Sequence, residues 1–219
     1  MAFLVSLTAA VLLASPQAPR TPACEHFEKG AKLIQLHVYE AEGGTRAGVS
    51  EGVRELEAAL DGGCPSREAD AFRMLGDAAW VYASQHAVSR QERRNFEWLA
   101  LSSYRKYVTL RPDDSHARFT LAMMLRGRES LKEVEELVRR DPNFAMGRLT
   151  LGRELVKRGN IRAGASHLAA SARLFDPAQA EDYGDEVVEL LEKHGRKKEA
   201  AEARKSVEAK KDEARTRRK

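Results

Sequence analysis

The residue types that most often carry chemistry are scattered along this chain. The six histidines fall one per segment, at His26, His37, His86, His116, His167 and His194. No two of them have the H-x3-H or H-E-x2-H spacing that places two zinc ligands on one helix face. Cys24-x-His26 is the only close cysteine–histidine pair, and it supplies too few ligands for zinc. We therefore expect no metal site and no cofactor.

Catalytic motifs are also missing from the sequence. The run from Gly43 to Gly48 is rich in glycine, but it lacks the Lys-Ser/Thr pair that contacts phosphate and magnesium in a phosphate-binding loop. There is no G-x-S-x-G nucleophile motif, no kinase signature and no recognisable pair of catalytic carboxylates. We expect a protein that is not an enzyme and has no small-molecule substrate.

The N-terminal segment favours export. Residues 2–14 form an uncharged, mostly apolar run, shorter than the roughly 20 residues of a membrane span and suited to the core of a signal peptide. We predict a signal peptide over residues 1–23 and a periplasmic or secreted location. No Lys or Arg precedes the run and no clean A-x-A site follows it, so a cytoplasmic chain and a lipoprotein acylated at Cys24 stay open as alternatives.

Cys24 and Cys64 are the only cysteines. In an exported chain an even pair predicts one disulfide, which would stabilise the first pair of helices by about 3–4 kcal/mol in the chain-entropy model. The alternative is two separate thiols.

Composition and turn signals indicate helices in thin layers. The chain has 219 residues, of which 32% are charged and 6% aromatic, so few large side chains are available for one thick core. Ala, Leu, Glu, Arg and Lys dominate, and alternating β-branched runs are absent. Pro112, Pro142 and Pro177 are 30 and 35 residues apart and are expected to follow helix ends. We predict an all-α array of helix pairs over 24–210, with units at 24–65, 66–112, 115–142, 145–177 and 181–210.

The fourth unit carries a recognisable repeat pattern. It reads Ala145-x5-Leu151-Gly152-x2-Leu155-x3-Gly159-x5-Ala165-x6-Ala172-x4-Pro177. This resembles the tetratricopeptide repeat (TPR), and the fifth unit is similar through Leu191, Gly195 and Ala200. The second unit has about a dozen extra residues and the third is about four short. The resemblance implies a right-handed superhelical array of antiparallel helix pairs, a TPR-like α-solenoid.

The resemblance also implies a concave groove, lined by the first helix of each pair, that binds a protein or peptide partner. Transferring the family's groove positions to this chain gives Arg73, Asp77, Trp80, Phe119, Met123, Arg126, Arg153, Lys157, Asp185 and Glu189. An exposed Trp80 could anchor a partner. The alternative is that Trp80, Phe119 and Met123 are core residues between helices.

The charge pattern suggests a second kind of contact. Residues 196–219 contain eleven Lys or Arg against five Asp or Glu. The excess of positive charge in this stretch is larger than the net charge of +4 of the whole chain. The basic tail, residues 211–219, could contact nucleic acid or an anionic membrane, although a solvated helix end explains the same composition. Arg90, Arg93 and Arg94 beside Phe96 and Trp98 form another candidate surface.

Our leading hypothesis from the sequence is therefore a noncatalytic interaction scaffold in the cell envelope or outside the cell. The alternative is a structural protein anchored through its basic tail.

Overall fold

The computed structural model describes residues 21–40 and 44–217, and within these residues every regular element is a helix. The elements are α1 (Pro22–Ile34), the π-helical turn η1 (Gln35–Tyr39), α2 (Arg46–Gly62), the short 3-10 turn η2 (Pro65–Arg67), α3 (Glu68–Val81), the π-helical turn η3 (Tyr82–His86), α4 (Arg90–Leu110), α5 (Ser115–Met124), α6 (Gly127–Arg140), α7 (Ala145–Lys157), α8 (Ile161–Leu174), α9 (Pro177–Lys193) and α10 (Lys197–Arg217). The all-α fold class predicted from the sequence is confirmed.

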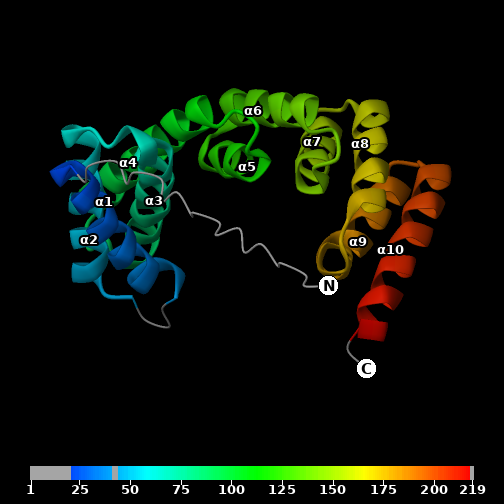
Figure 1. Ribbon diagram of the computed structural model, residues 1–219. Coiled ribbons are helices and arrows are strands. Elements are labelled where there is room, and N and C mark those ends of the chain that lie inside the picture. The colour runs from blue at the N-terminus through cyan, green and yellow to red at the C-terminus, as the bar shows by residue number, and fades with distance from the viewer. Residues whose placement is uncertain (1–20, 41–43, 218–219) are drawn as a thin grey trace, which may run out of the picture.

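The helices form an arch of pairs (Figure 1). Consecutive helices pack against each other as α1–α2, α3–α4, α5–α6, α7–α8 and α9–α10. In Figure 1, α5 and α7 lie on the inner side of the arch below α6, and α9 lies on the inner side of α10. We call the first helices of the pairs (α1, α3, α5, α7 and α9) the inner row and the second helices the outer row.

Several helices begin at a side chain that accepts a hydrogen bond from the first helical turn. These capping residues are Thr21, Thr45, Ser89, Asp114 and Asp176. Each satisfies a backbone N–H that has no partner within its helix. The short polar segments between the apolar stretches thus fix where the helices start.

Pro177 follows the end of α8, as predicted, but it also begins the next helix. The sequence suggests one unit over 145–177 and the next from residue 181, whereas α8 ends at Leu174 and α9 begins at Pro177. Asp176 and Gln179 form a capping box around this start. Proline suits the first helical position because the N–H that it lacks would have no intrahelical partner there.

A small residue in each inner helix lets the two helices of a pair approach closely. It is the eighth or ninth residue of its helix: Gly30 in α1, Gly76 in α3, Ala122 in α5, Gly152 in α7 and Gly184 in α9. A Cβ atom added at Gly152 would lie 2.8 Å from Cγ of Leu168 and 3.0 Å from its backbone nitrogen. At Gly184 it would lie 2.3 Å from Cγ1 of Val207. Ordinary carbon contacts are about 3.5–4.0 Å, so larger residues would force these helices apart.

The apolar core is divided along the array. One cluster joins α1, α2, α3 and α4 and includes Phe27 and Leu75, and another joins α7 to α10 and includes Leu168 and Leu191. Two smaller clusters join α3, α4 and α5, and then α5, α6 and α7. Each pair therefore contacts mainly its neighbours, as in other solenoids.

The unequal unit lengths have a simple structural origin. In the second pair, the turn η3 prolongs α3, and α4 has 21 residues. In the third pair, α5 has only 10 residues. The extra residues thus lengthen helices that are already part of the array.

The N-terminal pair is closed by the disulfide Cys24–Cys64, with 5.2 Å between the two Cα atoms. The bond joins the first turn of α1 to the residue before η2. The pairing predicted from the sequence is confirmed. A terminal pair has a neighbour on one side only, so a covalent link is most useful there.

The predicted signal peptide, residues 1–23, falls almost entirely outside the described residues. Of its residues, Thr21 caps α1, and Pro22 and Ala23 form the first turn of that helix. Among the described residues, no helix is both long and apolar enough to cross a membrane.

Replacing Gly152 with Ala should lower the stability of the protein by about 1–3 kcal/mol, the usual cost of overpacking a core. The steric conflict with Leu168 should outweigh the gain of up to about 1 kcal/mol in helix propensity. Urea unfolding measures the difference, and Arg162→Ala, an exposed position of the next helix, is the control that should change stability by less than about 0.5 kcal/mol. A Gly152→Ala protein as stable as the wild type would contradict the close packing.

Removing the disulfide by the double replacement Cys24→Ser and Cys64→Ser should cost about 2–5 kcal/mol. The loss should appear first in α1 and α2, because the remaining pairs still stabilise one another. Amide hydrogen exchange locates the loss, and the reduced wild-type chain should behave like the double variant. Equal loss of protection in α9 and α10 would argue against this localised effect.

Candidate functional site

The inner face of α3 carries three of the predicted groove residues. Arg73, Asp77 and Trp80 follow one another at helical spacing, so they share one stripe of the helix. On the opposite side, Leu75 and Ala78 are buried against the rest of the array. The amphipathic pattern of α3 thus directs the stripe away from the core.

Asp77 joins three parts of the chain. One oxygen of its carboxylate accepts a hydrogen bond from the hydroxyl of Tyr39, and the other accepts one from the hydroxyl of Tyr104. Tyr39 ends the turn η1 and Tyr104 belongs to α4, so Asp77 connects the first pair of helices to both helices of the second. Burial, together with the hydrogen bond and the charge of Asp77, raises the pKa of each tyrosine. Both hydroxyls therefore stay protonated and serve as hydrogen-bond donors.

A second carboxylate extends this polar group toward α5. Asp114 caps α5 by accepting a hydrogen bond of 2.9 Å from the N–H of Ala117, and it accepts another of 2.7 Å from the hydroxyl of Tyr107. Burial acts to raise the pKa of Asp114, but the two hydrogen bonds and the charge of Arg73 outweigh burial, so this pKa is lowered.

These groups surround a hollow of about 370 Å³ between α3, α4 and α5, lined by Arg73, Asp77, Tyr104, Asp114, His116, Ala117 and Thr120. Two predicted groove residues, Arg73 and Asp77, lie in it. Because both oxygens of Asp77 are bonded to tyrosines, this residue organises the wall of the hollow.

A second hollow, of about 330 Å³, lies between the end of α5, α6 and α7. Its walls include the predicted groove residues Met123, Arg153 and Lys157, and its apolar part includes Leu131 and Val134. It combines apolar surface with basic side chains, which suits an amphipathic segment of a partner.

Two of the charged groove residues form ion pairs within the molecule. Arg153 forms an ion pair with Glu186 of α9, and its guanidinium lies 5.6 Å from the centroid of the Tyr183 ring. Asp185 pairs with Lys211 of α10 at 2.7 Å. The charges of Arg153 and Asp185 are therefore partly neutralised within the molecule.

The exposure of the apolar groove candidates shows which of them lie on the surface and which are packed between helices. Trp80 is 45% exposed and Met123 is 48% exposed, whereas Phe119 is half-buried and packs on Phe144, with ring centroids 5.6 Å apart. Phe119 thus packs between helices, which was the alternative to a role in the groove. Trp80 and Met123 remain exposed, and Tyr39, which donates a hydrogen bond to Asp77, is 44% exposed.

The remaining predicted groove residues are peripheral. Arg126 is the exposed residue before α6, and Glu189 is exposed on α9. Neither lines one of the two hollows.

The basic tail does not form a separate segment over the described residues. Helix α10 runs without a break to Arg217, and residues 218–219 lie outside the described part. Arg215 pairs with Asp212 and Arg217 pairs with Glu213. These ion pairs reduce the positive charge that the tail presents.

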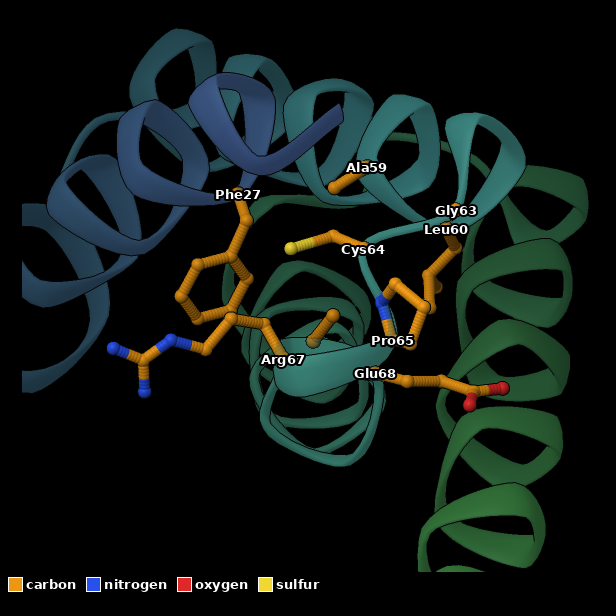
Figure 2. A pocket seen from close by; sticks show the side chains of 9 residues that line it. Phe27, Ala59, Leu60, Gly63, Cys64, Pro65, Arg67 and Glu68 are labelled. Atoms are coloured by element: carbon orange, nitrogen blue, oxygen red, sulfur yellow. The ribbon is translucent and has the colours of Figure 1, made fainter. Parts of the chain in front are cut away.

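A smaller cavity of about 170 Å³ lies beside the disulfide (Figure 2). The Cys64 sulfur points toward Phe27, and the Arg67 guanidinium lies 5.5 Å from the Phe27 ring centroid. None of the predicted groove residues lines this cavity. Among the described residues, no group of three or more His, Cys, Asp or Glu side chains could hold a metal ion.

Comparison with known proteins finds similar folds among solved structures. No protein-family model and no curated protein matches the chain. Three solved structures of MamA are similar: "Crystal structure of MamA" has a TM-score of 0.53 at 14% identity, covering 78% of this chain and 93% of that chain. The "MamA RS-1 ArsTM double mutant" has a TM-score of 0.59 at 16% identity, covering 87% of this chain and 97% of that chain. "Crystal structure of MamA protein" has a TM-score of 0.58 at 14% identity, covering 89% of this chain and 94% of that chain.

The fold is TPR-like. At these identities the similarity concerns the fold alone, so the function of the hollows has to be argued from their own residues.

Sequence reasoning missed the tyrosines and Asp114. Tyr104 and Tyr107 are three residues apart in α4, a visible signal that both face the same side of a helix. Their carboxylate partners, however, lie on other elements. Tyr39 could not be placed, because it lies in a π-helical turn that shifts the usual helical spacing.

We expect the tyrosine hydroxyls at this site to resist ionisation. The pKa values of Tyr39 and Tyr104 are raised above the ordinary value of about 10. The resulting contribution to stability is complete below about pH 10 and is lost as the pH rises through the folded-state pKa values. Tyrosinate absorbance against pH, recorded for the folded and the denatured chain, measures the effect.

The variant Asp77→Asn should move part of this titration back toward the ordinary range, because it removes the neighbouring negative charge but keeps the side-chain shape. If all five tyrosines of the folded wild-type chain ionise near pH 10, the buried hydroxyl network is absent.

Proposed function

We propose that the protein is a noncatalytic scaffold that binds an extended segment of a protein partner along the inner row of helices. A TPR-like fold is typically used in this way. The observation that carries the proposal is the exposure of Trp80 and Met123 on inner helices, beside the two hollows that groove residues line.

The two hollows give the proposed site its chemistry. The one between α3, α4 and α5 is polar, and its walls are held by hydrogen bonds from tyrosines to carboxylates. The one beside α7 has an apolar part and a basic edge. A partner segment that fits both would offer hydrogen-bonding groups to the first and an apolar side chain to the second.

Preorganisation favours such binding. The Asp77 network links η1, α3 and α4, so the wall beside Trp80 is already in place before a partner arrives. Less conformational entropy is then lost on binding. We further propose that the protein acts outside the cytoplasm, which the N-terminal apolar segment and the disulfide support.

The variant Trp80→Ala should weaken partner binding by roughly 30-fold, because an exposed tryptophan that becomes buried at an interface commonly contributes about 2 kcal/mol or more. A peptide can be selected from a random displayed library with the full chain as bait, and its affinity then measured by fluorescence anisotropy. Trp98→Ala is the matched control, because Trp98 is 69% exposed on α4, in the outer row.

Met123→Ala provides a second test at the other hollow. Selected peptides that bind Trp80→Ala and Met123→Ala as tightly as the wild type would contradict the proposal. So would peptides whose binding is lost only in Trp98→Ala.

A further inference from the structure

The outer row carries two strongly exposed apolar side chains close together in the sequence. Val88, just before α4, is 76% exposed, and Trp98, within α4, is 69% exposed. These are the highest values among the exposed large apolar side chains of the described residues. Neighbouring Phe96 is different, since it stacks on Tyr82 with ring centroids 3.9 Å apart.

Three arginines accompany these apolar residues. Arg90, Arg93 and Arg94 are exposed, and no carboxylate of the described residues lies within ion-pairing distance of them. Arg94 donates instead to the amide oxygen of Gln91, at 2.7 Å. We call Val88, Arg90, Arg93, Arg94 and Trp98 the arginine–tryptophan patch.

The patch keeps a net positive charge, with three arginines against Glu97, because Glu92 is directed inward. Glu92 accepts hydrogen bonds from the Arg46 guanidinium at 2.6 Å, the Tyr82 hydroxyl at 2.7 Å and the Val88 N–H at 2.9 Å. The backbone bond from Val88 and the two side-chain bonds lower the pKa of Glu92 to about 2. Glu97 is the other acidic residue of this part of α4, and it is exposed without an ion pair to the three arginines.

The backbone that carries the patch is fixed by the helix and by its start. Arg90, Arg94 and Trp98 are spaced four residues apart and lie along one stripe of α4. Ser89 caps the helix, and the bond between Glu92 and Val88 fixes the preceding residue. An open hollow of about 400 Å³ at this end is lined by Ala87, Val88, Ser89, Arg90, Arg93 and Arg94.

This combination favours a lipid surface over the other anionic partners. Guanidinium groups bind phosphates, and tryptophan is enriched where lipid headgroups meet acyl chains. A single-stranded nucleic acid would use several aromatic side chains for base stacking, but the patch offers one, and it would have no use for Val88. An acidic peptide would satisfy the arginines but would not require two exposed apolar side chains beside them.

We propose that the arginine–tryptophan patch binds the surface of an anionic phospholipid bilayer. The arginines contact headgroup phosphates, and Trp98 and Val88 enter the interface between headgroups and acyl chains. This binding does not depend on the inner hollows, so the scaffold could contact a membrane with α4 and a partner with its inner row at the same time.

Vesicle flotation with the full chain tests the proposal. Binding should occur to phosphatidylcholine vesicles that contain phosphatidylglycerol, should be much weaker to pure phosphatidylcholine, and should decrease as salt is added. Arg93→Gln combined with Arg94→Gln should weaken binding about 25-fold, since each basic residue near such a surface contributes about fivefold. Trp98→Ala should weaken it roughly tenfold through the lost apolar contact.

The matched control is Arg215→Gln combined with Arg217→Gln in α10, which changes the net charge by the same amount and should leave binding unchanged. Trp80→Ala should also bind vesicles normally. Equal loss in the α10 control would make the effect one of net charge, and no preference for anionic vesicles would overturn the proposal. Binding of polyglutamate or of single-stranded DNA through the same arginines, without vesicle binding, would overturn it as well.

A spectroscopic readout needs no change in the patch. The chain has two tryptophans, so Trp80→Phe leaves Trp98 as the only one. Its emission should shift to shorter wavelength with anionic vesicles and be quenched by brominated lipid. Unchanged emission and no quenching while the protein floats with vesicles would place another surface on the membrane and contradict the proposal. A failure of peptide binding by Trp80→Ala in the earlier experiment has no bearing on this result.

Discussion

The close approach of the two helices in each pair is the constraint on which the rest of the structure depends. It requires a small residue at one position of each inner helix, as Gly152 against Leu168 and Gly184 against Val207 illustrate. Once the pairs are closed, their short connections stack them into two rows. Each hollow lies between two neighbouring inner helices and the outer helix that joins them in the chain. At the second pair the same constraint serves the candidate site directly, since a Cβ at Gly76 would lie 2.6 Å from the Tyr104 ring that contacts Asp77.

Much of the fold could be predicted from the sequence because its determinants are local. Helix formers, turn residues and the Leu151-Gly152 pattern indicated an array of helix pairs, and the even number of cysteines indicated the disulfide. Pro177 follows the end of α8, as predicted, but its second role as the first residue of α9 was missed. The capping box formed by Asp176 and Gln179 marks that helix start. Gly30 and Gly184 were not recognised, since their role depends on which side chain faces them from another helix.

The candidate site could be predicted only in part for a related physical reason. The TPR resemblance assigned Arg73, Asp77 and Trp80 to the groove, and they do share one stripe because their spacing is internal to α3. The hydrogen bonds of Tyr39 to Asp77 and of Tyr107 to Asp114 join different elements, so no spacing within one helix reveals them. The pairing of charges between α7, α9 and α10 depends on tertiary register in the same way. Two charges assigned to the groove from the sequence, those of Arg153 and Asp185, are therefore paired in the folded chain.

The two rows use their charged residues differently, and this bears on what each can bind. On the inner row, Arg153 and Asp185 are paired within the molecule and Asp77 is bonded to two tyrosines, so apolar contact and fixed hydrogen bonds are expected to supply much of the binding there. On α4, Glu92 turns inward to Arg46 and Tyr82 and leaves the neighbouring arginines without a carboxylate partner among the described residues. The attraction of this face for an anionic surface thus follows from the interaction that fixes the start of α4. Loss of the inward contact would weaken the local fold and also return a negative charge to the patch, so stability and surface charge are coupled through one carboxylate.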